Sequence, residues 1–262
     1  MNSQSLLWSI LSPEGKTSWL FGTMHIRDER AYQMSKNLYP LILEADAFIG
    51  EMDMNRTSEV MEQTLYDARK NFTEAAFQKL RQQLLKSFQV DIALYNHLHP
   101  LMIMSVISNQ VLQAEHHISL DEHLWDFAKQ NGKMTLGLES YEEQFRILHT
   151  IDAIPLYSQI KSIGKSPSGV RKHTSKGLNL YVEGKIHALY MLSKSSMHDL
   201  RKKIIYKRNA KMADVIIRLD QGYTYFITVG AGHLSGKTGI LSSLKRAGWK
   251  VKPAGHVLKS KE

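Results

Sequence analysis

The chain has 262 residues, a formal net charge of +9 and no cysteine. The lack of cysteine excludes disulfides, thiolate metal ligands and cysteine nucleophiles, so any metal site must use His, Asp or Glu. No apolar run reaches the roughly 18 to 20 residues that cross a bilayer, and the first residues do not resemble a signal peptide. The sequence as given predicts a cytoplasmic protein, with export left open if a leader has been removed.

The first elements in chain order are two aromatic, β-rich runs, "SLLWSIL" and "TSWLFGT". The turn-rich "SPEGK" separates them, which predicts a hairpin. "YQMSKNLYPLILEA" then has helical spacing, and "DAFIGEMD" has the pattern of a short buried strand that ends in carboxylates. From residue 55 to about 130 the signal is mainly helical, as in "VMEQTLYDARKNF", and Pro100 is expected to open a buried helix.

The second half begins with "KMTLGLES", which predicts a strand with Glu139 at its end, and continues with a helix over "YEEQFRILHTI". "GKSPSGVRKHTSKG" is typical of a loop or mobile insertion. A long helix is expected over "DLRKKIIYKRNAKMADVIIRLDQG", stopped by Gly222. The strand "YTYFITVG", a loop, the helix "ILSSLKRAG" and the strand "WKVKPA" complete the chain. At this length, one α/β domain and two smaller domains are both open.

One pattern occurs twice: "SWLFGTMH" and "YFITVGAGH" are each an apolar strand followed by Gly-x-x-His. Ligands of α/β sheets bind at the carboxyl ends of strands, and glycine lets the chain turn sharply or approach a ligand closely. Two imidazoles and a carboxylate are a common set for a divalent metal ion. The alternative is that each histidine is a core or capping group and each acid a helix cap. The strand ends offer His25, Glu51 with Asp53, Glu139, and His233.

The stretch "AGHLSGKT" also fits a relaxed phosphate-loop pattern, in which Lys237 and Thr238 would contact phosphate and magnesium. Such loops normally follow the first strand of a parallel sheet, whereas only 24 residues remain here after Thr238. Nucleotide binding is therefore less well supported than a metal site or purely structural roles for these strand-end residues.

Other histidines carry less information. "EHHISLDEH" lacks the His-Glu-x-x-His spacing that places two ligands on one helix face, and its Ser119 and Glu122 form a capping-box pattern instead. "NHLHP" is typical of a turn before a proline. The histidines concerned are His97, His99, His116, His117 and His123.

A basic segment and Arg208 within it each have two possible roles. Lys161 to Arg208 holds twelve Lys and Arg against Glu183 and Asp199. This segment could attract an acidic partner, or it could form a solvated helical face, and no motif indicates nucleic-acid binding. Arg208 could likewise solvate a helix, or it could bind a substrate carboxylate or a developing oxyanion.

The ordered set "FGTMH", "FIGEMD", "SLDEHLWDFAKQNGKMTLGLESYEEQF", "LYVEGKIHAL", "KRNAKMADVI" and "FITVGAGHLSGKTGILSSLKRAGWKVKPA" resembles the TraB/GumN family, which includes the Tiki proteases. The resemblance spans almost the whole chain. It implies an α/β (α+β) fold like that of erythromycin esterases and ChaN-type proteins, with a central mixed sheet surrounded by helices and a cleft at the strand ends. We therefore expect one domain over residues 1–262, with a helical cover over roughly 55–130 and 141–220.

The resemblance also implies metal-dependent cleavage of a peptide or protein substrate. The implied ligands of a manganese, cobalt or zinc ion are His25, Glu51 and His233, with Asp53 as a second-shell candidate. Further recurring family positions match Glu139, Gln144, Arg208 and Asn209. Lys185 replaces an acidic residue that is frequent in the family, which leaves substrate preference open. The alternative that remains is a non-catalytic protein that binds haem, a metal or a polypeptide in the same cleft.

Overall fold

The computed structural model describes residues 5–55, 66–112, 115–197, 200–220 and 222–254, and within them six strands form one sheet. The strands are β1 (Leu7–Leu11), β2 (Thr17–Thr23), β3 (Ala47–Met52), β4 (Met134–Glu139), β5 (Tyr225–Gly230) and β6 (Lys250–Pro253). Their order is β4-β3-β5-β2-β1-β6. This arrangement confirms the predicted mixed sheet, and the hairpin and every strand predicted above are present.

Four strands of the sheet are parallel to one another. β2 pairs with β5, β5 with β3, and β3 with β4, all in parallel, whereas β1 and β6 add antiparallel strands on the far side of β2. β2 and β5 are buried almost throughout, which explains their nearly continuous apolar sequences. Because β2, β3, β4 and β5 run the same way, their carboxyl ends lie along one edge of the sheet, where ligands of α/β proteins bind.

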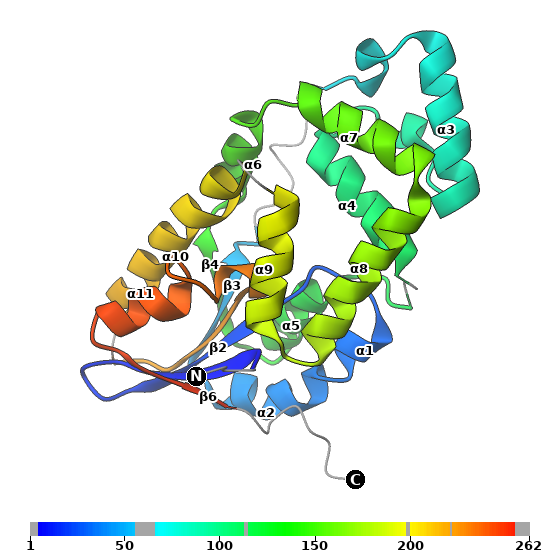
Figure 1. Cartoon of the computed structure of the whole chain (residues 1–262). Helices are drawn as coiled ribbons and strands as arrows, with labels where there is room; N and C mark the ends of the chain where they lie inside the picture. Colours follow the sequence, from blue (N-terminus) through cyan, green and yellow to red (C-terminus); the bar gives the residue numbers. More distant parts are fainter. Residues whose placement is uncertain (1–4, 56–65, 113–114, 198–199, 221, 255–262) are drawn as a thin grey trace.

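Helices surround the sheet and extend beyond it (Figure 1). They are α1 (Glu29–Tyr32), α2 (Ser35–Glu44), α3 (Glu74–Phe88), α4 (Pro100–Val111), α5 (Leu120–Gln130), α6 (Tyr141–His149), α7 (Ile154–Lys165), α8 (Pro167–Val182), α9 (Ile186–Met197), α10 (Lys207–Arg218) and α11 (Ile240–Arg246). Short helical turns are η1 (Ala68–Asn71), η2 (Ile92–Tyr95), the π-helical η3 (Lys202–Tyr206) and η4 (Ala231–His233).

Most buried apolar side chains of the described residues belong to one of two separate clusters. The larger one joins both faces of the sheet to α2, α5, α10 and α11. The smaller one lies among α3, α4, α7, η1 and η2, which Figure 1 shows gathered away from the sheet. The predicted helical cover is therefore divided, because α5 and α10 pack on the sheet while α3, α4 and α7 pack on one another. None of the described helices is long and apolar enough to cross a membrane.

Local signals placed several helix ends correctly. α4 begins at Pro100 with His99 as its N-cap, as the pre-proline turn predicted. α5 begins after Ser119, whose backbone N–H donates to the Glu122 carboxylate at 2.7 Å, as the capping box predicted. The pattern "VMEQTLYDARKNF" lies partly outside the described residues, and its last residues form the single turn η1.

The prediction of a loop or mobile insertion at "GKSPSGVRKHTSKG" is wrong, because most of this segment belongs to α8. Pro167 occupies the first turn, where proline is favourable. Thr174, Leu178 and Tyr181 recur at helical spacing and are buried, and a Cβ added to Gly177 would lie 3.7 Å from a Leu192 methyl group of α9. The glycines and serines of the segment hid this spacing.

The long helix predicted over residues 199–222 is interrupted. The chain passes through η3 before it continues as α10, and α10 ends at Arg218 rather than at Gly222. A π-helical turn inserts an extra residue into a helix and is frequent at functional sites. Here it immediately precedes Arg208 and Asn209.

Candidate functional site

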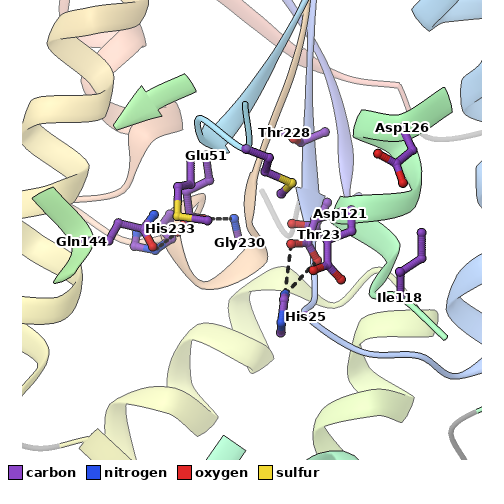
Figure 2. Close-up of a pocket in the computed structure, with 13 residues that line it drawn as sticks. Thr23, His25, Glu51, Ile118, Asp121, Asp126, Gln144, Thr228, Gly230 and His233 are labelled. Atoms are coloured by element: carbon purple, nitrogen blue, oxygen red, sulfur yellow. Dashed lines mark hydrogen bonds and ion pairs between the residues drawn. The ribbon is translucent and has the colours of Figure 1, made fainter. Parts of the chain in front are cut away.

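A cavity of about 600 Å³ lies at the carboxyl ends of the parallel strands, as predicted. Its walls come from segments that are far apart in the sequence (Figure 2). At β2 and β3 they are Thr23, which ends β2, His25 just after it, Glu51, Met52 and Met54. The others are Thr228, Gly230 and His233 at β5, Ile118, Asp121, Glu122 and Asp126 at α5, and Gln144 of α6.

The two Gly-x-x-His motifs contact each other, and each glycine is required by a close approach. A Cβ on Gly22 would lie 2.7 Å from a Leu234 methyl group and 3.1 Å from Ala231 Cα. A Cβ on Gly230 would lie 3.2 Å from Glu51 Oε2 and 3.3 Å from His233 Cδ2. Close packing, and not backbone conformation, therefore favours glycine at these two sites, because neither residue has a positive φ.

Glu51 is held at both carboxylate oxygens. Oε2 accepts the Gly230 backbone N–H at 2.6 Å, and Oε1 accepts from Arg208 Nη2 at 2.5 Å. Burial would raise the pKa of Glu51, but the charge of Arg208 and these hydrogen bonds, with a further contribution from His233 when its ring is protonated, outweigh burial and lower the pKa. Glu51 is therefore a fixed carboxylate anion at the end of β3.

His233 is almost fully buried and is oriented by Asn209. Its Nδ1 lies 2.6 Å from Asn209 Oδ1, while Asn209 Nδ2 donates to the Thr238 carbonyl at 2.8 Å. Because the Thr238 contact uses the amide NH₂ group, Asn209 presents its oxygen to the ring and His233 must carry its proton on Nδ1. Burial lowers the pKa of His233 to about 4. His233 Nε2 is therefore an unprotonated acceptor, and it lies 3.9 Å from Glu51 Oε1.

His25 occupies a different environment from its counterpart. Its side chain is 61% exposed, against 6% for His233, and its Nδ1 lies 3.0 Å from Asp121 Oδ2. The bond to Asp121 raises the pKa of His25 well above its usual value. Thr23, not Gly22, lies opposite Gly230 in the β2–β5 register, and η4 bends the second motif sharply while the first continues without a helical turn. The repeated motif therefore does not produce equivalent histidines.

Arg208 forms ion pairs with both Glu51 and Glu139. Arg208 donates to Glu139 Oε2 through Nε at 2.9 Å and through Nη2 at 2.6 Å, and its side chain is 11% exposed. Gln144 Nε2 lies 3.3 Å from the same oxygen. Arg208 and Glu139 also line a second cavity of about 290 Å³. These contacts give Arg208 a defined task, the pairing of two carboxylates, and its predicted contact with substrate stays a prediction.

Asp53 does not line the large cavity. Its carboxylate accepts the backbone N–H of Asn55 at 2.9 Å, which caps a turn after β3. The role predicted for Asp53, a hydrogen bond to a histidine that ligates the metal, has no support in these contacts.

The remaining histidines and the phosphate-loop pattern have other surroundings. His116 pairs with Glu29 at 2.7 Å and stacks on Tyr32, and His123 bonds to the Tyr39 hydroxyl at 2.7 Å. Lys237 and Thr238 are exposed and line neither of the two cavities above. These positions agree with the structural roles that the sequence suggested.

A divalent metal ion fits part of the predicted ligand set. Two atoms that share one ion with bonds of about 2.0–2.2 Å lie at most roughly 4.4 Å apart, so His233 Nε2 and Glu51 Oε1 meet this condition at 3.9 Å. His25 lines the same cavity. Within the described ranges, however, no three His, Asp or Glu side chains converge on one point closely enough to hold an ion.

Sequence reasoning missed the acidic wall that α5 contributes. Asp121 and Asp126 lie in the stretch that was assigned to a helix start, and they line the cavity. A signal was present in part, because Glu122 and Asp126 are four residues apart and so share one face of α5, and Asp121 lies in the same first turn.

Four exposed lysines of the basic segment lie on two helices of the predicted helical cover. Lys161 and Lys165 are on α7, and Lys172 and Lys176 are on α8, all four exposed and absent from the walls of both cavities. An acidic partner for this segment stays a prediction.

The fold and the site define an α/β protein with a cavity, lined in part by carboxylates and histidines, at the carboxyl ends of its parallel strands. Comparison with known families goes further: residues 6–253 match the TraB/PrgY/gumN family, and the chain belongs to it. It is also similar to a protein of Amphimedon queenslandica named "Metalloprotease TIKI homolog", with 24% identity over 196 residues. The match covers 63% of this chain and 38% of that relative. No solved structure matches, so the likeness to ChaN-type proteins stays an expectation.

Proposed function

We propose that this protein is a metal-dependent hydrolase that cleaves peptide bonds. The observation that carries the proposal is the pair of acceptors, His233 Nε2 and Glu51 Oε1, which lie 3.9 Å apart in the wall of one cavity. Two unprotonated acceptors side by side suit a cation better than a hydrogen-bond network. The similarity to a protein named as a metalloprotease supports the same reaction class.

The residues of this chain have separable tasks in the proposed site. His233 and Glu51 would hold the ion, and His25 on the same cavity is the third candidate ligand. Asn209 fixes the ring of His233, while Gly230 and Arg208 fix the carboxylate of Glu51. A divalent ion, when bound, acidifies a water molecule and polarises a substrate carbonyl.

Chelation and restoration test the proposal. Peptide cleavage by the purified protein should be abolished by a chelator and restored by manganese, cobalt or zinc, and His233→Ala should remove both cleavage and metal binding. Lys237→Ala is the control, because Lys237 lies outside the cavity. Full cleavage by His233→Ala, or full metal content in it, contradicts the proposal. Loss of nucleotide binding on Lys237→Ala would instead revive the phosphate-loop hypothesis.

One observation favours a non-catalytic alternative. His25 is not brought together with Glu51 and His233 as a single three-ligand group in the described part of the chain. A protein that binds haem or a polypeptide in this cavity does not need three side chains to converge on one ion. A haem absorption band in the isolated protein, or stable metal binding without any peptide cleavage, would support this alternative.

A further inference from the structure

His25 has a charged partner that the sequence motif does not contain. Asp121, in the first turn of α5, lies with its two carboxylate oxygens 3.0 and 3.3 Å from His25 Nδ1. Both side chains line the large cavity. Figure 2 shows His25 and Asp121 directed at each other on one side of this cavity, with Glu51 and His233 on the other side. The Asp121 side chain is only 20% exposed, so the contact is partly shielded from water.

Backbone hydrogen bonds bring these two residues together. The Leu120 N–H donates to the Ile26 carbonyl at 3.1 Å, and the N–H groups of Glu115 and His116 donate to the Arg27 carbonyl at 3.0 and 3.2 Å. The loop that carries His25 is therefore attached to the segment that leads into α5. Asp121 and His25 each lie one residue from the Leu120–Ile26 bond, which limits how far they can separate.

A purely structural explanation of Asp121 is an acidic residue that stabilises the helix N-terminus. That task is already served by Glu122, which accepts the Ser119 N–H in the same turn. An N-terminal charge would also be favourable with its carboxylate directed to solvent. The observed carboxylate is directed at a ring nitrogen of a candidate ligand instead.

We propose that Asp121 is a positioning residue for His25: it binds Nδ1, fixes the ring and leaves Nε2 as the nitrogen available to a metal ion. This inference rests on the proposed function and adds a residue to it. It also explains why two similar motifs need different supports, since Asn209 performs the same task for His233 with a neutral amide. Loss of a hydrogen-bond partner that orients a ligating histidine typically lowers metal affinity or activity about 10–100-fold.

The test uses Co²⁺ alone as the probe and three variants of the full chain. Asp121→Ala removes the contact, and Asp121→Asn keeps an oxygen that can accept from Nδ1–H. Glu29→Gln, the control, changes the carboxylate partner of His116, a pair that lines neither cavity. We expect Asp121→Ala to lower Co²⁺ affinity about 10–100-fold and to change the visible absorption of bound Co²⁺. Asp121→Asn should restore most of both, and Glu29→Gln should change neither.

Three results would overturn the proposal. One is unchanged affinity and absorption in Asp121→Ala. Another is an equal loss in Asp121→Asn and Asp121→Ala, because the negative charge itself would then be required. The third is a further loss when Asp121→Ala is added to His25→Ala, because a residue that acts through His25 has nothing left to position in that background.

A structural readout separates this proposal from the proposed function. In crystals of the metal-free variants, His25 should keep its rotamer in Asp121→Asn and lose it in Asp121→Ala. If the wild-type protein binds no divalent ion but His25 follows this pattern, the hydrolase proposal fails while the contact stands. If wild type binds the ion and His25 keeps its rotamer in both variants, the positioning role is refuted and the hydrolase proposal survives. Circular dichroism melting of each variant shows that the fold is retained.

Discussion

The backbone N–H of Gly230 donates to Glu51 Oε2 at 2.6 Å, which joins the carboxyl ends of β5 and β3. The second Gly-x-x-His motif therefore contributes more than its histidine, because its glycine also fixes the carboxylate that faces that histidine. A side chain on residue 230 would enter the space between them.

Gly230→Ala tests this arrangement. The new Cβ would lie 3.2 Å from Glu51 Oε2 and 3.3 Å from His233 Cδ2, so both groups must move. We expect metal affinity to fall about 10–100-fold, with an overpacking cost of about 1–3 kcal/mol in the free energy of unfolding. Gly232→Ala is the matched control, since a Cβ there meets no atom within 4 Å. Equal effects of the two substitutions would contradict the prediction.

Asn209→Ala should weaken metal binding through His233. The variant leaves His233 Nδ1 without its oxygen partner, so the ring can rotate and exchange its tautomer. We expect a loss of about 10–100-fold in Co²⁺ affinity, measured by calorimetry. Asn179→Ala, at an exposed site on α8, should leave the affinity unchanged. An Asn209→Ala protein that binds Co²⁺ like wild type would exclude this role.

Arg208→Met should destabilise the protein strongly. Arg208 pairs with Glu139, which is 1% exposed, and with Glu51, so its loss leaves two carboxylates unpaired. Removing one partner of a buried ion pair costs about 3–5 kcal/mol. Arg218→Met removes an exposed pair with Asp214 and should cost about 0–1 kcal/mol. Denaturant unfolding measures both, and similar losses would show that Arg208 is not part of a buried network.

The buried side chain of His99 should make the free energy of unfolding depend on pH. Burial lowers the pKa of His99 below its usual 6.5, so the unfolded chain binds a proton that the folded protein excludes. Its contribution to stability is therefore complete above pH 6.5 and is lost as the pH falls below that value. His99→Asn preserves a side-chain cap for Leu101 and should flatten the fall in unfolding free energy between pH 7 and 5. Exposed His97→Asn should leave the slope unchanged; a slope insensitive to His99→Asn would refute the assignment.

Local chemistry explains what the sequence predicted well. Strands with buried apolar patterns, Pro100 at a helix start and the capping box at Ser119 depend on neighbouring residues, and the structure contains all three. α8 was missed because glycine and serine obscured its buried face. The placement of strand-end residues along one edge follows from parallel strands, so His25, Glu51 and His233 could be assigned to one cavity.

The differences between these residues could not be predicted, because they depend on register and on distant partners. The one-residue offset between β2 and β5, together with η4, makes His233 buried and His25 exposed. Asp121 is 96 residues from His25 in the sequence. Arg208 similarly reaches Glu51 across 157 residues, so its pairing with carboxylates was not visible in its own helix.

The separate apolar cluster of α3, α4 and α7 has a consequence for dynamics. None of the residues that line the large cavity belongs to that cluster. Segments with their own core can open as cooperative units at a lower free energy than global unfolding. Amide protons of α3 should therefore exchange with solvent before those of β5, while the contacts between Glu51, Gly230 and His233 persist.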